Sequence, residues 1–493
     1  ARGYTAWDCT SPAFIKDNTL YIPTVFFSHN GDSLDNKTPL LRSMEAVNRQ
    51  ALRVLRLLGD DKTERVIANV GAEQEYFLIS REDYENRPDL KICGRTLFGA
   101  RSAKGQEMDD HYFGRLRLKV SEYMRELDSE LWKFGVPSII RHNEAAPAQH
   151  ELAPIFTITN IAADQNQLTM ELMQKIAAKH GLVCLLHEKP FEGVNGSGKH
   201  NNWSMATDTG VNLLNPGDTP FENAQFLLFL CAVIKAVDDY QDLLRISVAT
   251  AGNDHRLGAN EAPPAVVSIF LGDELTAVLE AIEAGEDYTG SGETVMRLGV
   301  DVLPGFRRDT TDRNRTSPFA FTGNRFEFRG VGSGANCACA MIVLNTAVAE
   351  ALTDFRQRVD ARLAKGENKM NIILDELRRD IKACAPIRFE GNGYSKEWRD
   401  EARLRGLDCE TSTPVSYDRY LDDSSVRMFE TMNVMHRSEL QARNEIKWET
   451  YWKKIQIEGR VLGDLCMNHI IPVATRYQSE LADNVMKIQS TFP

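Results

Sequence analysis

The chain has 493 residues, of which 42% are hydrophobic and 26% are charged, as is usual for a globular protein. The formal net charge of −12 excludes a general attraction to nucleic acid or to anionic membranes. The sequence has no apolar run of transmembrane length and no signal-peptide pattern, so we expect neither a membrane nor a nucleic-acid partner.

Nine cysteines are scattered along the chain, and none of them forms a CxxC pair. Their odd number and wide spacing are typical of reduced thiols in a cytoplasmic protein. The chain opens on Ala-Arg-Gly and closes on Ser-Thr-Phe-Pro, so we expect a central portion of a longer protein.

Hydrophobic spacing in residues 1–204 predicts alternating strands, helices and loops. In chain order the prediction is a strand at 20–27, a helix at 40–58, a strand at 71–79, a surface loop at 81–114, a helix at 116–134, two strands around a turn at 138–156, a helix at 160–180, a strand at 182–186 and a Gly-rich loop at 187–204. Long loops in compact enzymes are often substrate loops, and 81–114 is a candidate.

The later residues are mostly helical in pattern. The prediction is a buried helix at 221–244, a loop at 251–264, a helix at 272–284, a turn at 312–318, a strand at 324–329 and helices at 335–364 and 369–383. The composition then shifts, with a charged, Gly-rich stretch at 386–420 and a helical tail at 421–490 that we interpret as structural. This shift divides the chain into residues 1–385 and an extension, 386–493.

The strand at 71–79 places two acids on an apolar face. Because side chains two apart on a strand share a face, Glu73 and Glu75 point the same way as Phe77 and Ile79. A buried, unpaired carboxylate is costly, so these acids must be neutralised, hydrogen-bonded or bound to a metal. The alternative is a solvated face of the sheet with the two apolar residues at its margin.

Two more stretches repeat this pattern. Glu144 and Glu151 flank the turn at 138–156, with His142 and His150 close by; the alternative is a polar hairpin loop. In the loop at 187–204, the segment Asn195-Gly-Ser-Gly is flexible enough to bring backbone N–H groups to an anionic ligand. His200 follows this segment, and in a chain with spare carboxylates such a histidine favours metal ligation over a structural role.

Arginines accompany acids in two further stretches. Arg256 can hold a carboxylate bidentately, and Glu261 lies on a loop that could close over a site; the alternative is a surface ion pair. In Arg325-Phe-Glu-Phe-Arg329, alternation predicts a strand with its charged residues on one face. With Arg313 and Arg315 just upstream, this strand is interpreted as an anion-facing wall that contains Glu327, although a solvated edge strand would look similar.

Five strand or near-strand glutamates, one histidine and several arginines therefore form the candidate site. Oxygen-rich ligands suit Mg²⁺ or Mn²⁺, which commonly work with substrate phosphates. Such a set indicates two metals and a phosphoryl transfer, without identifying the substrate.

A series of motifs in this order resembles the glutamine synthetase family. The motifs are Gly71-Ala-Glu-Gln-Glu-Tyr-Phe-Leu, His142-Asn-Glu with Gln149-His-Glu, Asn195-Gly-Ser-Gly-Lys-His, Asn260-Glu-Ala-Pro, Arg313-Asn-Arg and Arg325-Phe-Glu-Phe-Arg. The sequences of His187-Glu-Lys-Pro-Phe and of residues 253–264 resemble those of the type III branch. The resemblance covers most of residues 1–385.

The resemblance implies a role for each matched residue. Implied ligands are Glu75, Glu144 and Glu151 for one metal, and Glu73, His200 and Glu327 for the other. Implied glutamate-binding residues are Asn195, Gly196, Arg256, Arg329 and Glu261; implied ATP or phosphate contacts are Ser204, Arg315, Arg325 and Phe156; and the implied catalytic residues are Glu261, Arg315 and Arg256.

The family also implies an activity and an architecture. The activity is the ligation of ammonium to L-glutamate with ATP, through γ-glutamyl phosphate and with two Mg²⁺ or Mn²⁺ ions per site. The architecture is α+β, with a curved antiparallel β-sheet (guanido-kinase-like) inside helices, in a cytoplasmic dodecamer of two hexameric rings. An N-terminal β-grasp domain that the family implies is not found in this chain.

The sequence departs from the commoner family pattern at several points. The spacings from Glu144 to Glu151 and from Arg256 to Glu261 are each one residue shorter. Asn202 stands where many relatives have a nucleotide-contacting histidine, and Ala320 where they have a second phosphate arginine. Two rival interpretations remain: a γ-glutamyl ligase that uses another amine, and a non-catalytic structural relative, against which the six intact predicted ligands argue.

Overall fold

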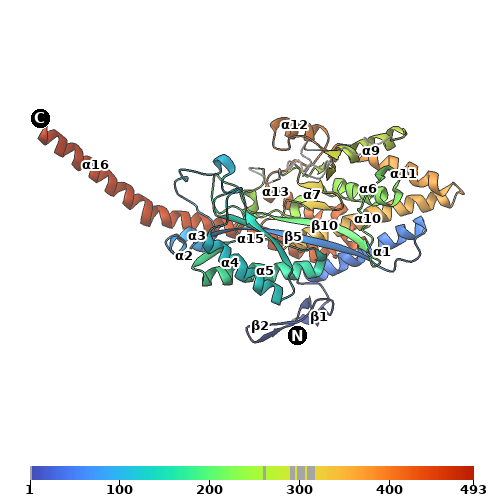
Figure 1. Cartoon of the computed structure of the whole chain (residues 1–493), viewed down its shortest axis with the longest axis horizontal. Helices are drawn as coiled ribbons and strands as arrows, with labels where there is room; N and C mark the ends of the chain where they lie inside the picture. The colour runs from blue at the N-terminus through green and yellow to red at the C-terminus, as the bar shows by residue number, and fades with distance from the viewer. Residues whose placement is uncertain (1–2, 259–262, 289–294, 297–305, 308–316, 493) are drawn as a thin grey trace.

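A nine-stranded β-sheet runs through the body of the protein in this computed structural model, which describes residues 3–258, 263–288, 295–296, 306–307 and 317–492 (Figure 1). Its order is β11-β14-β15-β10-β5-β7-β6, and β8 and β9 also pair with β5. The strands are β5 (Val66–Ser80), β6 (Ser138–Asn143), β7 (Gln149–Pro154), β8 (Thr157–Ile158), β9 (Leu182–Leu185), β10 (Lys199–Thr207), β11 (Ile269–Phe270), β14 (Phe319–Phe321) and β15 (Phe326–Phe328). Neighbouring strands are antiparallel except β11 and β14, so the protein combines an extensive sheet with many helices.

Strand β5 is the longest strand of the sheet and organises the strands around it. It pairs with β10 along one stretch and with β9, β7 and β8 along others. Gln74, Tyr76 and Leu78 on one face are buried. The side chains of Tyr76 and Leu78 pack with residues of α4 (Leu118–Lys133) and α5 (Thr159–Lys179). The predicted sidedness of this strand is therefore confirmed, with Glu73 and Glu75 left on the opposite face.

Three helices build the main core beside the sheet. They are α1 (Lys37–Leu58), α6 (Ala224–Asp239) and α10 (Ala338–Leu363), and α10 packs on both of the others. Among the described residues, α10 is the one helix long and apolar enough to cross a membrane, but 78% of its apolar window is buried. We therefore interpret α10 as a core helix whose N-terminal half is apolar because protein surrounds it, whereas its C-terminal half carries charged residues such as Arg358.

The remaining helices cover the sheet and extend beyond it (Figure 1). They are α2 (Arg81–Glu85), α3 (Pro88–Cys93), α7 (Gln241–Ser247), α8 (Ala251–Asp254), α9 (Asp273–Ala284), α11 (Lys369–Ala383), α12 (Lys396–Leu404), α13 (Thr413–Asp418), α14 (Asp423–Thr431), α15 (Arg437–Leu465) and α16 (Ile471–Thr491). The predicted helices at 40–58, 116–134, 160–180, 272–284, 335–364 and 369–383 are confirmed within a few residues. The predicted helical tail is confirmed as well.

Several predicted boundaries are wrong, and one of them is the loop at 251–264, whose first residues form α8 (Ala251–Asp254). The helix at 221–244 is interrupted at Tyr240, whose φ and ψ of −128° and 31° are not helical and whose hydroxyl binds Glu350. The strand at 20–27 is interrupted at Pro23, which has no amide hydrogen to donate to a ladder. The loop at 81–114 contains the locally capped helices α2 and α3. The end of the loop at 187–204 is strand β10, which depends on pairing with the distant strand β5.

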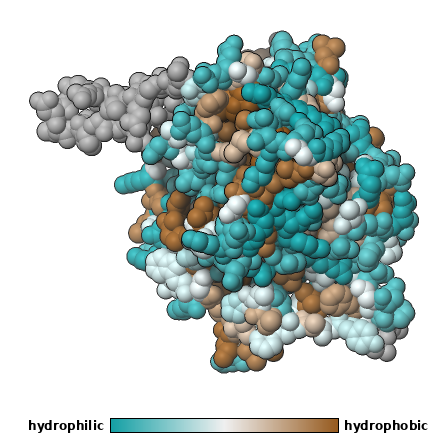
Figure 2. All heavy atoms as spheres, turned by 90° about the vertical axis from the view of Figure 1, so that its right-hand side faces the viewer, coloured by the Kyte–Doolittle hydropathy of each residue, from teal (hydrophilic) through white to brown (hydrophobic). Residues whose placement is uncertain are grey.

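Small sheets of two strands lie outside the main sheet. At the N-terminus β1 (Gly3–Trp7) pairs with β4 (Thr24–Ser28), and β2 (Phe14–Lys16) with β3 (Thr19–Tyr21). A further pair joins β12 (Val295–Met296) to β13 (Phe306–Arg307). The N-terminal strands project from the lower edge of the body in Figure 1, and hydrophobic surface is visible along the lower edge of Figure 2. Exposed apolar residues there include Tyr4, Trp7, Ile15, Leu20 and Phe26.

A buried polar bridge ties three elements of the core together and gives a stability prediction. Asn345 of α10 accepts a hydrogen bond from the indole of Trp203 at 2.9 Å and donates one to Ser43 of α1 at 3.2 Å, and all three side chains are fully buried. Asn345→Ala should lower the free energy of unfolding by about 1–3 kcal/mol, because the indole N–H is left without a partner. Urea unfolding measures this, with Gln167→Ala on the exposed face of α5 as the control. Equal unfolding midpoints for the two variants would contradict the account.

Candidate active site

One face of the sheet carries acidic side chains on neighbouring strands. The antiparallel register places Glu151 of β7 directly opposite Glu75 of β5, and Glu73 of β5 directly opposite His200 of β10. Opposed side chains in such a ladder lie about 5 Å apart at Cβ, so their charges interact strongly. The sequence pattern that put these residues on strands therefore becomes a compact polar cluster once the strands pair.

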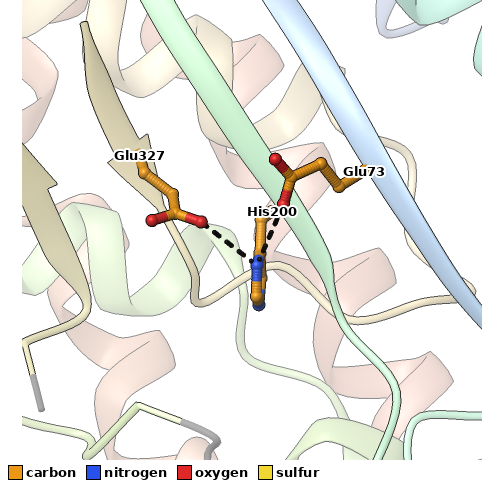
Figure 3. Close-up of side chains that lie close together, drawn as sticks. All are labelled: Glu73, His200 and Glu327. Atoms are coloured by element: carbon orange, nitrogen blue, oxygen red, sulfur yellow. Dashed lines mark ion pairs between the residues drawn. The ribbon is translucent and has the colours of Figure 1, made fainter. Parts of the chain in front are cut away.

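The first group consists of Glu73, His200 and Glu327 (Figure 3). The Nδ1 atom of His200 lies 3.3 Å from an oxygen of Glu73 and 3.3 Å from an oxygen of Glu327. Burial alone would lower the pKa of His200, but its hydrogen bonds to Glu327 and Glu73 outweigh burial and raise the pKa to about 10. The imidazole proton thus supplies positive charge between two carboxylates, at a point where all three ligand atoms lie within 4.8 Å of one another.

The second group consists of His142, Glu144 and Glu151, whose ligand atoms also lie within 4.8 Å of one another. The two ring nitrogens of His142 are 3.5 Å from Glu144 and 3.8 Å from Glu151. Burial, and after it the charges of Glu73, Glu75 and Glu144, raise the pKa of Glu151 well above its ordinary value. Carboxylates this close repel one another, and a divalent cation would relieve that repulsion.

Glu75 lies between the two groups. One of its oxygens is 3.9 Å from Nε2 of His200, and the other accepts a hydrogen bond from the backbone N–H of Gly198 at 2.5 Å. The structure therefore brings together all six side chains that the sequence nominated as metal ligands. Their residues are Glu73, Glu75, Glu144, Glu151, His200 and Glu327.

His142 is a member of the site that sequence reasoning noted but did not nominate as a ligand. It pairs directly with Glu151 across β6 and β7, and it precedes Glu144 by two residues. The signal was available in the alternation of His142 and Glu144 along one strand end, but recognising it required the register between the two strands.

The glycine-rich segment after Asn195 packs closely on Arg256. A Cβ atom on Gly196 would lie 2.9 Å from Cγ of Arg256, and one on Gly198 would collide with its guanidinium. Arg256 is 2% exposed, and its guanidinium donates to the backbone carbonyl of Arg329 at 3.1 Å and to that of Gly330 at 3.4 Å. Among the described residues no carboxylate forms an ion pair with Arg256, and its hydrogen-bond partners there are neutral oxygen atoms. Glu261, which would pair with Arg256 in the alternative interpretation of a surface ion pair, lies outside the described residues.

Asn202 connects the first group to the predicted phosphate-binding arginine. Its side-chain amide donates to Glu73 at 2.8 Å and accepts from Nε of Arg325 at 3.1 Å. On the sheet Asn202 is also the direct cross-strand partner of Glu327, and Ala320 is the partner of Glu327 on its other side. The departures from the common family pattern at positions 202 and 320 thus lie on either side of one acid.

The other predicted nucleotide contacts lie farther along the same face. Ser204 follows Asn202 by two residues on β10 and is buried. Phe156 is 60% exposed and covers Gly71, where an added Cβ would lie 3.2 Å from the Phe156 side chain. Gly71 pairs with Asn202, so the aromatic ring is held beside the polar cluster.

The segment 81–114 reaches the site. Gln106 donates to the side-chain oxygen of Asn195 at 2.9 Å, and the ring of His111 binds the backbone carbonyl of Glu144 at 2.7 Å. Its interpretation as a substrate loop is compatible with these contacts. Of the predicted site residues, Glu261 and Arg315 lie outside the described residues, as do Asn260 and Arg313 of the motif series.

Three sequence-family models match the chain. They are the type III glutamine synthetase N-terminal model at residues 1–43, the glutamine synthetase catalytic domain at 48–264 and the glutamine synthetase C-terminal domain at 372–489. The catalytic match contains both candidate metal groups except Glu327.

Full-length relatives agree with these matches. A glutamine synthetase of Bacteroides fragilis is 51% identical over 495 residues, covering 100% of this chain and 68% of that protein. A type-3 glutamine synthetase of Dictyostelium discoideum is 48% identical, covering 99% of this chain and 67% of that protein.

A solved structure supports the fold. It is described as "GmaS/ADP complex-Conformation 1", and it superposes with a TM-score of 0.52 at 17% sequence identity, covering 90% of this chain and 79% of the other. Identity this low speaks to fold alone. The close sequence relatives decide the family, and they favour neither the other-amine ligase nor the non-catalytic relative. The chain belongs to the type III branch of the glutamine synthetase family and is a glutamate–ammonia ligase, which makes glutamine with ATP.

Proposed function

We propose that the two side-chain groups each hold a divalent cation, Mg²⁺ or Mn²⁺, and that Glu75 completes the group of Glu144 and Glu151. Carboxylate oxygens with one imidazole are a donor set that suits these ions. The proton of His200, held between two carboxylates, stands in for positive charge at the first group. The observation that carries this proposal is the juxtaposition of both groups on one face of the sheet.

The ligase reaction assigns roles to the chain's own residues. The γ-carboxylate of glutamate attacks the γ-phosphate of ATP, ADP leaves, and ammonia then displaces phosphate from γ-glutamyl phosphate. When bound, the two cations neutralise charge on the transferred phosphate. We assign Asn195, Gly196 and Arg329 to glutamate, and Arg256 to supporting that loop from behind with its buried charge.

The remaining assignments concern the nucleotide and the acyl phosphate. Arg325 and Arg315 contact phosphate oxygens, Ser204 and Phe156 contact the nucleotide, and Asn202 orients Arg325. Glu261 binds ammonium and excludes water from γ-glutamyl phosphate, which would otherwise be hydrolysed. The roles of Arg325, Arg315, Ser204, Phe156 and Glu261 follow the family resemblance, whereas those of Arg256 and Asn202 rest on their hydrogen bonds in this structure.

We extend the proposal to the whole protein. It comprises a catalytic part at 1–385 whose sheet curves around the substrates, a helical extension at 386–493, and a dodecamer of two hexameric rings in the cytoplasm. The two close relatives are longer than the aligned region, since this chain spans 68% and 67% of them.

The activity test is phosphate release from ATP in the presence of glutamate and ammonium. Glu327→Ala should lower kcat/KM by about 10²-fold or more, because the first group loses a carboxylate ligand for the cation that would neutralise charge on the transferred phosphate. Glu64→Ala, which removes an exposed acid near the start of β5, is the matched control and should keep the wild-type rate. Equal rates for Glu327→Ala and wild type would exclude the assignment of Glu327, and faster turnover with a small amine than with ammonium would instead favour the other ligase.

Metal binding can be measured without turnover. Mn²⁺ titration followed by electron paramagnetic resonance should give two bound ions for wild type and one fewer for Glu73→Ala or for Glu144→Ala, since each variant damages a different group. Excess Mg²⁺ should release the bound Mn²⁺. If both variants kept the wild-type isotherm, neither group would be a metal site.

The close packing of the glycine loop predicts a steric effect on glutamate binding. Gly196→Ala should raise the KM for glutamate and lower kcat/KM by about 10²-fold, because the new methyl group meets the side chain of Arg256 and the carbonyl of Glu188. Gly463→Ala, at a helical position open on all sides, is the control and should leave the kinetics unchanged. A Gly196→Ala enzyme with wild-type KM would show that the loop is free to move away.

A further inference from the structure

Residues 106–114, which we call the strap, connect two functional parts of the site. The strap lies between α3 and α4 in the sequence and contains a short 3₁₀ turn at Glu107–Asp109. Its first residue binds Asn195 at the start of the glycine loop, and a later one binds the turn between β6 and β7 that carries Glu144. One short stretch of chain therefore holds a predicted glutamate-binding residue and a predicted metal ligand.

Gln106 holds the main chain and the side chain of Asn195 at once. Its side-chain nitrogen donates to Oδ1 of Asn195 at 2.9 Å, and its side-chain oxygen accepts from the backbone N–H of Asn195. Asn195 is buried, so water competes little for these bonds. Because Gln106 engages the oxygen of the Asn195 amide, that amide presents its nitrogen, an N–H donor, on its other side. A donor at this point suits a carboxylate of glutamate.

His111 holds the turn that carries Glu144. Nδ1 of its ring lies 2.7 Å from the backbone carbonyl of Glu144, and Nε2 lies 3.3 Å from the backbone nitrogen of Ala148. A carbonyl only accepts and a backbone N–H only donates, so Nδ1 carries the ring proton and Nε2 is the acceptor. Ala148 has a φ of 64°, in the left-handed region that favours glycine, and its bond to His111 helps to hold that conformation.

The backbone of the strap also contacts this turn. The side-chain nitrogen of Asn143 donates to the carbonyls of His111 and Gly114, each at 3.1 Å, and Asn143 is buried. Strap contacts thus fall on the residue before Glu144, on the carbonyl of Glu144 itself and on Ala148, four residues later. The backbone that carries the Glu144 carboxylate is fixed from both directions.

The strap is held in a costly conformation between its two anchor residues. Met108 and Asp109 have φ values of 70° and 51°, and side chains rarely adopt this left-handed region. Such conformations persist only where surrounding contacts impose them, and they cluster at functional sites. The bonds of Gln106 and His111 lie on either side of these two residues and supply such contacts.

We propose that Gln106 and His111 are positioning residues, with Gln106 orienting the amide of Asn195 for glutamate and His111 setting Glu144 for its cation. The inference rests on the proposed function, in which Asn195 binds glutamate and Glu144 binds a metal. It adds that the strap, and not the sheet alone, fixes the geometry of these two groups.

Steady-state kinetics of the whole chain test the Gln106 end of the strap. Gln106→Ala should raise the KM for glutamate by about 10-fold, because Asn195 loses the bond that orients its amide, and should leave the KM for ATP unchanged. Asn195→Ala should also raise the KM for glutamate, and adding Gln106→Ala to it should change little more, since both act through one amide. Lys104→Ala, which removes an exposed ion pair with Asp110, is the control and should change neither KM.

Three kinetic outcomes would overturn the inference. A wild-type KM for glutamate in Gln106→Ala beside a raised KM in Asn195→Ala would remove the role of Gln106 and leave the proposed function intact. A wild-type KM in both variants would remove the assignment of Asn195 as well. Equal increases in the KM for glutamate and for ATP would show a general loss of structure instead of a positioning role.

Mn²⁺ titration followed by electron paramagnetic resonance tests the His111 end. His111→Phe keeps a ring but loses both hydrogen bonds, so it should weaken one of the two bound ions about 10-fold and leave the other unchanged. His111→Asn should restore most of the lost affinity, because its side-chain nitrogen can replace Nδ1 as the donor to the carbonyl of Glu144.

The metal-binding result also separates the inference from the proposed function. Wild-type binding in His111→Phe while Glu144→Ala loses one ion would overturn the role of His111 alone, as would equal weakening in His111→Phe and His111→Asn. Wild-type binding in Glu144→Ala would overturn the metal assignment and the inference together.

Discussion

Repulsion among carboxylates on one face of a β-sheet is the constraint on which the rest of this structure depends. Glu73 and Glu75 come from β5, Glu151 from the adjacent strand β7 and Glu327 from β15, with β10 between β15 and β5, and Glu144 follows the end of β6. In isolation each would be solvated, but in the folded protein Glu75, Glu144, Glu151 and Glu327 are buried. Folding therefore creates a demand for positive charge, and His200 meets part of it with a proton. The fold therefore creates an acidic cluster that needs positive charge, and the chemistry of the site follows from that need.

The scaffold must be rigid enough to hold these charges together. The reverse face of β5 supplies this rigidity, since Gln74 is fully buried and hydrogen-bonded to Ser333 and Asn166, and Tyr76 is sealed beneath α4 and α5. The backbone of β5 is paired on both sides. A strand that cannot twist or slip keeps Glu73 and Glu75 at a fixed separation, so the two groups are preorganised before any ligand arrives.

Sequence reasoning reached the site more easily than the fold. The alternation in 71–79 was enough to place Glu73 and Glu75 on one face, because that information is local. Local patterns do not nominate His142 as a ligand, and they predict a loop where residues 199–204 are part of a strand. Both features depend on the pairing of segments that are apart in the sequence. The apolar pattern predicts a continuous helix through Tyr240. The break there accompanies a hydrogen bond from the Tyr240 hydroxyl to Glu350, which is 110 residues away in the sequence. The arrangement of Arg256 against carbonyls could not have been predicted from residue types, which suggested a carboxylate partner.

The amide of Asn202 has a consequence for how the site responds to its ligands. One amide group binds a member of the first metal group through its nitrogen and the guanidinium of Arg325 through its oxygen. An amide is planar and polar in one direction, so it cannot rotate to serve one neighbour without abandoning the other. Asn202 therefore connects Glu73 and Arg325 through one side chain, so that a rotation of its amide changes both hydrogen bonds together. A histidine at this position would respond to a change in pH, whereas the amide of Asn202 does not titrate and responds only to changes at Glu73 and Arg325.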